Sequence, residues 1–510
     1  MQLTGLALFG NDSFCVDDCD VAAAGRDRFG DFFPEFYHTA SNADAVSGAG
    51  GTSPIRSRRE NDMRKKIAAP FFLNRRELLR LLGIGTGALA AGQLLDGCAV
   101  DPVTGRQQLM MMSEGQEIDL DRQRSPYQFS SDYGVIQDAS LNSYINRVGR
   151  DLASRSHRPQ MPFSFRGVNA ASINAYAFPG GSIAVTRGML VELDNEAELA
   201  ALLGHEIGHV CARHTAEQSS KGMLANIFMA GAAIATSAAG YGGASDLVQN
   251  LGGLGAGALL ASYSRENERE ADGLGMEYMT RAGYSAQGMV GLMHVLKRNQ
   301  KHNPSAIELM FATHPMSDER LAFAQREAAT TYQASLANPL SREQYLDHTA
   351  GLRRLKPAIT ALQDGSTAMA KKQYPAAREH FASALQMMPQ DYAALVMLAS
   401  CHFAMQEMDE AEQVARQATT VYPAEPQAHI ITAVVSLNRK KYDQALQHLS
   451  AYDRLLPGNP LILFYKGYSF EGMGRQQEAA VQYNGFLKKV RSGKQAQHAH
   501  ARLKSWGYLR

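Results

Sequence analysis

The stretch EAELAALLGHEIGHVCARH, residues 196–214, places two histidines and a glutamate in an apolar pattern with helical spacing. Residues 194–196 supply N-cap chemistry, so the sequence predicts one long helix that begins there. His205 and His209 are four residues apart and lie on the same helix face, where both imidazoles can reach one metal ion. Burying them together with Glu206 would be costly unless a metal or other partners satisfied these groups.

The pattern His-Glu-x-x-His is typical of zinc peptidases and predicts one Zn²⁺ per chain. Zinc lowers the pKa of a bound water to roughly 7, and Glu206 can take the proton of that water as it attacks a peptide carbonyl. The longer metzincin pattern requires a histidine ten residues after His205, but Thr215 occupies that position. His214, one residue earlier, is interpreted as a surface residue or as support for the metal ligands.

A catalytic zinc takes three protein ligands and keeps a fourth position for water, so a third ligand has to be found. The segment SRENEREAD, residues 264–272, is predicted to be helical and offers four carboxylates. Glu268 and Asp272 are four residues apart and share one helix face. We expect Glu268 to bind the metal and Asp272 to orient a metal-bound histidine. Glu266 and Glu270 are interpreted as the solvated face of this helix.

These motifs together carry a family resemblance. HEIGH and NEREAD, with NAYAFPGGSIAVTRG at residues 174–188 before them and THPMSDERL at residues 313–321 after them, resemble the gluzincin peptidases of the HtpX and CAAX-prenyl-protease type. The resemblance covers roughly residues 101–326. It implies that the third zinc ligand is the glutamate of an E-x-x-x-D motif, here Glu268, with Asp272 as the paired acid.

The same resemblance implies roles for two further residues. His314 matches a histidine that can occupy the fourth zinc position and hold the enzyme inactive, although a histidine beside a proline is more often a loop residue. Arg320 matches an arginine near the site that stabilises the oxyanion. Residues 174–185 are expected to supply an edge strand near the zinc, to which an extended, unfolded substrate can add by backbone hydrogen bonds.

The last third of the chain repeats with a period of 34 residues. Three sets of residues share this period: Pro389, Pro423 and Pro457; Ala377, Ala411, Ala445 and Ala479; Gly365, Ala399, Ala433 and Gly467. This period and the placement of small residues predict tetratricopeptide units, whose helix pairs stack into a solenoid. We expect its concave surface to bind proteins, because a simple brace for the catalytic body would need less exposed groove.

An export signal is predicted inside the chain. A basic segment that begins at Met63 and contains Arg75-Arg76 is followed by fifteen uncharged residues, 81–95. The apolar run is shorter than the roughly 20 residues of a membrane-spanning helix, which favours a cleaved signal with a twin-arginine character. A signal normally begins the polypeptide, so we expect translation to start at Met63 and residues 1–62 to lie upstream of the true start or to be disordered.

Residues 95–98 resemble a lipobox, in which Cys98 would receive a lipid, although Asp96 is unusual there. The alternative is that Cys98 is only a small residue after the signal. The other cysteines show no disulfide framework. Their positions are Cys15, Cys19, Cys211 and Cys401. The first two could form a metal pair, but no partner residues accompany them.

Between the signal and the repeats, the sequence predicts a mostly helical body with a small sheet. Helices are expected from Ser113, where a capping box begins, and from about Asp138. Alternating residues around Phe163 and the turn at residues 179–181 predict strands. The Gly/Ala-rich stretch 223–260 is interpreted as helices that cover the active site, with a membrane span as the alternative.

The composition describes an ordinary globular protein, with 45% hydrophobic residues and a formal net charge of +1 over 510 residues. This balance argues against nucleic acid as a partner. The predicted fold is an α+β zincin-like metalloprotease domain followed by an all-α tetratricopeptide solenoid. The predicted division is 1–62 upstream or disordered, 63–98 export signal, 99–345 zinc metalloprotease domain, 346–357 linker and 358–510 repeat domain.

The predicted function is a zinc metalloendopeptidase of the bacterial periplasm that degrades misfolded or stalled envelope proteins. The repeats would recruit substrates or the outer-membrane assembly machinery, and a lipid on Cys98 would tether the enzyme to the outer membrane. The alternative is a chaperone or scaffold that acts through the repeats with little proteolysis. A third possibility, a prenyl-type protease within the bilayer, needs several spans, and the sequence offers only one candidate.

Overall fold

The computed structural model describes residues 98–100, 102–105, 107–109, 112–218, 263–302 and 304–509 of the chain. The predictions for residues 1–62, for nearly all of the export signal and for the stretch 223–260 lie outside the described residues. Within the described part, the structure has no helix with the length and apolar character needed to cross a membrane.

Two capped helices open the described body. Helix α3 (Glu114–Ser131) begins with the predicted capping box, in which Ser113 accepts a hydrogen bond from the backbone of Gln116 and donates its own N–H to the Gln116 side chain. Helix α4 (Ala139–Ala153) begins after its N-cap Asp138, and its apolar face is buried. The sequence patterns therefore located both helix starts correctly.

A three-stranded sheet follows these helices. Its strands are β3 (Ser164–Val168), β4 (Ala175–Ala177) and β5 (Ser182–Thr186), in the order β3-β5-β4. Strand β5 is parallel to β3 and antiparallel to β4, and the predicted turn at residues 179–181 joins β4 to β5. Among the described strands, β4 is therefore an edge strand. A separate short hairpin pairs β1 (Cys98–Val100) with β2 (Gln107–Leu109).

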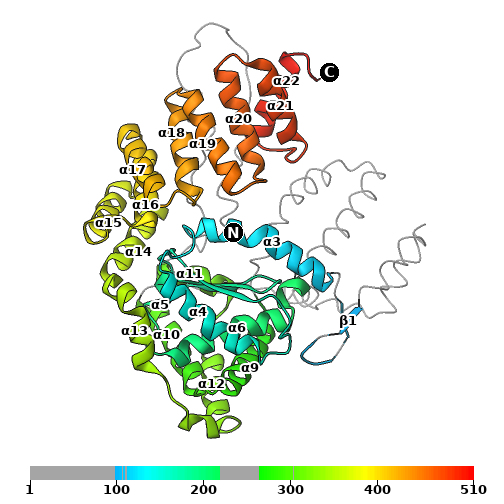
Figure 1. Ribbon diagram of the computed structural model, residues 1–510, viewed down its shortest axis with the longest axis vertical. Helices are drawn as coiled ribbons and strands as arrows, with labels where there is room; N and C mark the ends of the chain where they lie inside the picture. Colours follow the sequence, from blue (N-terminus) through cyan, green and yellow to red (C-terminus); the bar gives the residue numbers. More distant parts are fainter. Residues whose placement is uncertain are drawn as a thin grey trace, which may run out of the picture.

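The other described helices of the body include α6, which carries both histidines. They are α5 (Arg187–Leu190), α6 (Glu196–Cys211), α9 (Arg265–Arg281), α10 (Gln287–His302), α11 (Pro304–Thr313), α12 (Asp318–Ala329) and the 3₁₀ helix η5 (Gln333–Ala337). All residues of α6 are buried, because it packs against α4, α9, α10 and β4 (Figure 1). The apolar run around the histidines is thus the centre of the core.

Helix α13 (Arg342–Arg354) occupies most of the segment that was predicted to be a linker, residues 346–357. Its Tyr345 is fully buried and donates a hydrogen bond of 2.6 Å to the backbone oxygen of Leu190. Arg353 donates a hydrogen bond of 2.7 Å to the backbone oxygen of Leu193. These contacts hold the segment against the body as a helix.

The repeat region is entirely helical, as predicted. Its helices are α14 (Lys356–Ala370), α15 (Tyr374–Met387), α16 (Tyr392–Ala404), α17 (Met408–Val421), α18 (Gln427–Asn438), α19 (Tyr442–Leu455), α20 (Pro460–Gly472), α21 (Gln476–Leu487) and α22 (Lys494–Ser505). Consecutive helices pack as antiparallel neighbours, and the pairs stack along an arc that leads from α13 to a position over α3 (Figure 1). The buried small residues of the 34-residue period allow this close stacking.

The repeats contact the body through the loops that lead into α16, α18 and α20. Asp391 forms two ion-pair contacts of 2.5 and 3.0 Å with Arg187. One repeat later, Glu425 accepts a hydrogen bond of 2.5 Å from Ser130. In the following loop, the backbone oxygen of Pro457 accepts a hydrogen bond from the hydroxyl of Tyr127. The corresponding loop of three successive repeats therefore faces the body.

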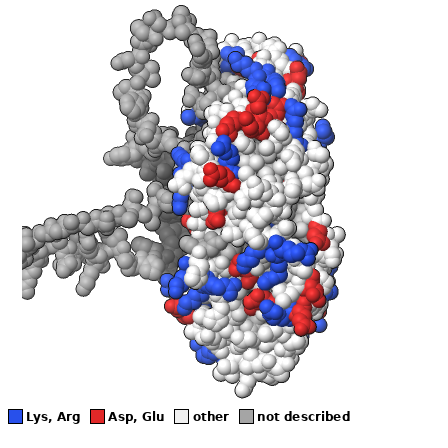
Figure 2. Space-filling model, turned by 90° about the vertical axis from the view of Figure 1, so that its left-hand side faces the viewer, with Lys and Arg blue, Asp and Glu red and all other residues white. Residues whose placement is uncertain are grey.

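Charged residues of both signs are interspersed on the face of the molecule that Figure 2 shows. On the described part of that face, basic residues form no continuous basic surface that excludes acidic ones. This mixture agrees with the near-zero net charge of the chain.

Candidate metal centre

Helices α6 and α9 approach closely because small residues line their contact. A Cβ atom on Gly204 would lie 3.0 Å from the backbone oxygen of Gly275, and one on Gly208 would lie 3.0 Å from that of Ala271. Such distances are tighter than ordinary van der Waals contacts. Glycine at both positions of α6 therefore lets the carboxylates of α9 reach the histidines of α6.

Four buried side chains form one cluster of possible metal ligands, namely His205, His209, Glu268 and His314. One ligand atom from each lies within 4.8 Å of the others. The Nε2 atoms of His205 and His209 are 3.0 Å apart. The carboxylate of Glu268 lies 3.6 Å from the first of these nitrogens and 3.4 Å from the second. Two helices thus supply three of the four donors.

His314 comes from the segment between α11 and α12. Its Nδ1 lies 3.0 Å from Glu268 Oε1 and 3.4 Å from His205 Nε2. Burial alone would lower the pKa of His314, but the carboxylates of Glu268 and Glu206 outweigh burial and raise this pKa. The structure therefore brings His314 into contact with Glu268 and His205, and its role as a fourth ligand stays a prediction.

Asp272 and Arg320 lie behind the cluster. Asp272 Oδ1 is 2.9 Å from His205 Nδ1, the position from which a carboxylate can orient this imidazole. Arg320 donates two hydrogen bonds of 2.7 Å to the two oxygens of Asp272, and its Nη1 lies 2.6 Å from Glu268 Oε2. Burial opposes ionisation of Asp272, but Arg320 lowers its pKa overall. Asp272 therefore stays ionised beside His205.

The ion pairs of Arg320 bear on its predicted role. Its guanidinium faces two carboxylates and donates a further hydrogen bond of 3.2 Å to the backbone oxygen of Pro315. This arrangement suits a residue that positions Asp272 and Glu268. Oxyanion stabilisation by Arg320 stays a prediction.

His214 and Tyr263 complete the surroundings of His209. His214 is buried, and its Nδ1 lies 2.9 Å from His209 Nδ1. Its Nε2 lies 3.3 Å from Glu270 Oε2. The ring of Tyr263 stacks on His209 with 3.9 Å between centroids, and its hydroxyl shares a hydrogen bond of 2.8 Å with Thr215. From the sequence, two roles stayed open for His214. Tyr263 was not predicted, because it lies before α9 without a motif of its own.

Glu206 is the candidate base. Its side chain is 1% exposed, and its Oε1 is buried without a hydrogen-bond partner. The closest cationic group in the cluster is His314, whose Nε2 lies 4.0 Å from this oxygen. Burial raises the pKa of Glu206, so its carboxylate holds a proton more readily than an exposed glutamate does.

The donors in the cluster fit a divalent metal ion. Imidazole nitrogens and carboxylate oxygens are ligands that zinc accepts, with bonds of about 2.0–2.1 Å. A tetrahedron with such bonds has edges of about 3.3 Å. Four distances among His205 Nε2, His209 Nε2, Glu268 Oε1 and His314 Nδ1 are 3.0–3.4 Å and lie close to this value. The unpartnered Oε1 of Glu206 also fits a water held beside the metal.

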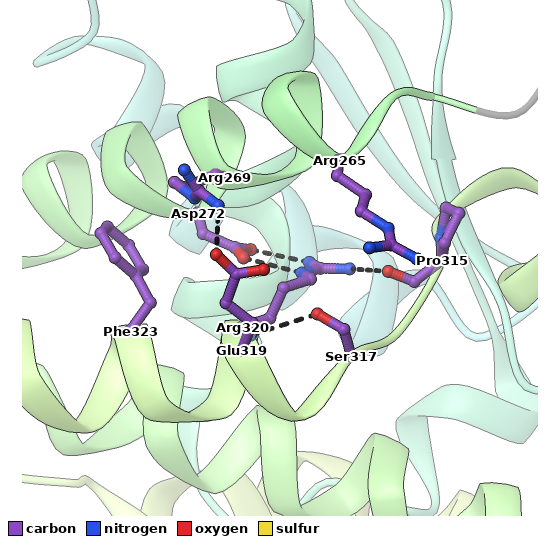
Figure 3. Close-up of a pocket in the computed structure, with 8 residues that line it drawn as sticks. All are labelled: Arg265, Arg269, Asp272, Pro315, Ser317, Glu319, Arg320 and Phe323. Carbon is purple, nitrogen blue, oxygen red and sulfur yellow. Dashed lines mark hydrogen bonds and ion pairs between the residues drawn. The ribbon is translucent and has the colours of Figure 1, made fainter. Parts of the chain in front are cut away.

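Asp272 and Arg320 also line a small pocket (Figure 3). Arg265 and Arg269 from α9 and Glu319 and Phe323 from α12 also line it. Figure 3 shows the guanidinium of Arg320 directed from α12 toward the carboxylate of Asp272. The pocket therefore opens onto the residues that support the ligands.

Comparison with known families agrees with this geometry. Residues 139–328 match the model of peptidase family M48, and residues 368–435 match that of the tetratricopeptide repeat. The chain carries an M48 peptidase domain. All residues of the cluster lie within this M48 domain, and M48 peptidases are metal-dependent. The family resemblance and the fold class predicted from the sequence are therefore confirmed.

Several curated relatives are similar to the M48 domain. A beta-barrel assembly-enhancing protease of Yersinia pestis is 34% identical over 198 residues, which are 38% of this chain and 40% of the relative. That of Escherichia coli K12 is 32% identical over the same shares. The metalloprotease YcaL of Escherichia coli K12 is 34% identical over 160 residues, 31% of this chain and 59% of the relative. The chain thus matches about 40% of the length of the first two.

The solved structure of YrrB, described as a tetratricopeptide protein with an unusual peptide-binding site, is 15% identical and covers 40% of this chain and 97% of its own, with a TM-score of 0.27.

Proposed function

We propose that this chain is a zinc-dependent endopeptidase in which His205, His209 and Glu268 bind the metal and Glu206 is the catalytic base. The observation that carries the proposal is the buried four-donor cluster beside a glutamate whose Oε1 has no hydrogen-bond partner. A structural metal site does not require a carboxylate without a hydrogen-bond partner next to its ligands, whereas hydrolysis requires such a group to accept a proton.

The residues divide the reaction among them. A bound zinc would supply a Lewis acid that polarises the scissile carbonyl and acidifies the attacking water. Glu206 Oε1 takes the proton of the attacking water and delivers it to the leaving amine. Its raised pKa favours this shuttle, because a base whose pKa lies nearer the working pH also acts well as an acid. Asp272 favours the tautomer of His205 that has its proton on Nδ1, so the lone pair of Nε2 is free for the metal.

His314 is proposed to regulate the site. Its Nδ1 lies 3.0 Å from Glu268 Oε1 and 3.4 Å from His205 Nε2, so it can bind the same metal ion and occupy the position that water needs. Displacement of this histidine by substrate would then start catalysis. Arg320 is proposed to hold Asp272 and Glu268 in place, and its contribution to the oxyanion remains part of the same proposal.

Substrates are proposed to be unfolded segments of envelope proteins. Among the described strands, β4 is an edge strand, and it packs against helix α6, which carries His205 and His209, so an extended peptide can add to it with little dependence on sequence. The repeats offer a protein-binding solenoid on the same chain. A periplasmic location, recruitment of the outer-membrane assembly machinery and a lipid on Cys98 complete the proposal, which the names of the relatives support in part.

The test is the variant Glu206→Gln. We expect it to retain one zinc per chain and to lose cleavage of an unfolded model protein such as reduced casein, because the amide cannot accept the proton. Glu266→Gln, an exposed position on α9, is the matched control and should cleave normally. Undiminished cleavage by Glu206→Gln would remove the proposed base.

A deletion strain separates this proposal from a chaperone role. Full complementation by Glu206→Gln, together with failure of a chain that lacks the repeats, would favour a function carried by the repeats alone.

A further inference from the structure

His214 faces His209 only because the chain changes direction between them. Residues five apart on a continuous helix point about 140° away from each other. Helix α6 ends at Cys211, and Arg213 adopts a left-handed conformation with φ of 57°. This turn brings His214 Nδ1 to 2.9 Å from His209 Nδ1. A non-glycine residue rarely adopts this conformation, so something must hold it there.

Glu117 holds the turn. Arg213 Nε donates a hydrogen bond of 2.7 Å to Glu117 Oε1, and its Nη2 donates one of 2.6 Å to the backbone oxygen of Met112. Arg158 lies 2.7 Å from the other oxygen of Glu117 and also donates a hydrogen bond of 2.9 Å to the backbone oxygen of Val210. Glu117 is fully buried. Helix α3 thus anchors the turn that aims His214 at His209.

The contacts determine where each proton lies. His209 directs Nε2 toward the metal cluster, so this nitrogen must carry the lone pair and Nδ1 the proton. The Nδ1 proton can then be donated only to an unprotonated His214 Nδ1. A neutral His214 must carry its own proton on Nε2, which faces Glu270 Oε2 at 3.3 Å. The order Glu270, His214, His209 therefore has one consistent set of tautomers.

We propose that His214, oriented by Glu270, is a positioning residue that fixes the tautomer and ring plane of His209 and thereby sets the affinity of the site for its metal. The inference rests on the proposed metal site. The two histidine ligands then differ in their support, because His205 has the carboxylate of Asp272 at 2.9 Å whereas His209 has the imidazole of His214 at the same distance. Glu270 was interpreted from the sequence as a solvated residue, and its Oε2 atom now has a role in orienting His214.

The test compares zinc affinity of the full chain in competition with a chromophoric chelator. His214→Phe keeps a ring but removes the acceptor, and we expect its zinc affinity to fall about 10- to 100-fold, the usual effect of losing such a support. His214→Asn places an amide oxygen near the former Nδ1 and should recover most of that loss. Glu270→Gln keeps an acceptor without the charge, so its loss should be smaller than that of His214→Phe.

Thermal unfolding in EDTA controls for the fold, and Glu266→Gln on the same helix serves as the matched exposed variant. A merely structural His214 would lower the unfolding temperature in EDTA and leave the zinc affinity of the folded protein unchanged. Equal zinc affinity in the wild type and His214→Phe would overturn the inference, and so would equal losses in His214→Phe and His214→Asn. If His214→Phe does not fold, His214→Asn and Glu270→Gln still test the order of affinities. Cleavage is not the readout, so failure of the proposed base would be seen separately.

Discussion

The candidate metal centre and the contact between the repeats and the body both bury carboxylates, but the pKa values of these carboxyls shift in opposite directions. At the candidate metal centre, burial alone would raise the pKa of Asp272 and Glu268, but Arg320 lowers that of Asp272, and His314 with His209 lowers that of Glu268. At the repeat contact, Glu425 receives a hydrogen bond from the Ser130 hydroxyl, and burial raises its pKa to about 7.

Asp132, at the end of α3, shares the second environment. It accepts hydrogen bonds from the hydroxyl of Tyr176 in strand β4 and from the amide of Gln128, and burial raises its pKa to about 6. Asp272 and Glu268 therefore stay ionised near neutral pH, whereas Glu425 and Asp132 gain and lose protons in that range. Neighbouring cations and imidazoles make this difference, because burial alone would raise the pKa of all four carboxyls.

The largest expected effect comes from removing the guanidinium of Arg320, which neutralises two buried carboxylates. Arg320→Met would leave Asp272 and Glu268 buried without their cation, and losing one partner of a buried ion pair typically costs about 3–5 kcal/mol. Urea unfolding of the apo protein measures this loss. Arg269→Met breaks the exposed pair with Glu319 and should cost less than about 1 kcal/mol. Equal losses in both variants would show that burial does not distinguish the two pairs.

The next effect is the pH dependence of the repeat contact. The pKa of Glu425 is raised from 4.5 to about 7, so its contribution to stability is fully present below pH 4.5 and is lost as the pH rises through 7. This shift corresponds to about 3 kcal/mol. We expect Glu425→Gln to become more stable than the wild type across this window, with a constant difference above pH 7, in thermal unfolding at several pH values.

Glu410→Gln, at an exposed position on α17, is the control for this experiment and should follow the wild type. A stability difference between Glu425→Gln and the wild type that did not change with pH would contradict the role of Glu425 ionisation.

A smaller effect separates backbone strain from crowding at the contact. Gly134 has a φ of +81°, and a Cβ there would lie 2.6 Å from Glu425 Oε2. Gly283 has a φ of +86° with nothing within 4 Å of such an atom. Both alanine variants carry the left-handed strain, and Gly134→Ala should lose about 1–2 kcal/mol more because of overpacking. If the unfolding midpoints of both variants fall equally, the Glu425 side chain moves aside from the added methyl group with no loss of stability.

Much of this molecule was predictable because its strongest patterns are local. The histidine helix, the capping box at Ser113 and the 34-residue period each depend on spacing within one segment, and the structure has all three. The carboxylate helix α9 was also predicted, since Glu268 and Asp272 share a helix face. The roles assigned to these residues in binding the metal stay predictions.

What the sequence could not predict depends on chain reversals and long separations. The sequence left His214 either as a surface residue or as support for the metal ligands, because the left-handed turn at Arg213 that brings it to His209 has no sequence signal. Ser130 and Glu425 are 295 residues apart and meet only because the solenoid curves over α3. The segment predicted as a linker is helical because Tyr345 is buried against the body.

X-ray absorption at the zinc edge, on the zinc-loaded wild type and on His314→Ala, tests the metal centre most directly. We expect three imidazoles and one carboxylate around zinc in the wild type and two imidazoles in His314→Ala at full occupancy. Zinc bound without the imidazoles of His205 and His209, or the same number of imidazoles in both proteins, would contradict the centre proposed for this chain.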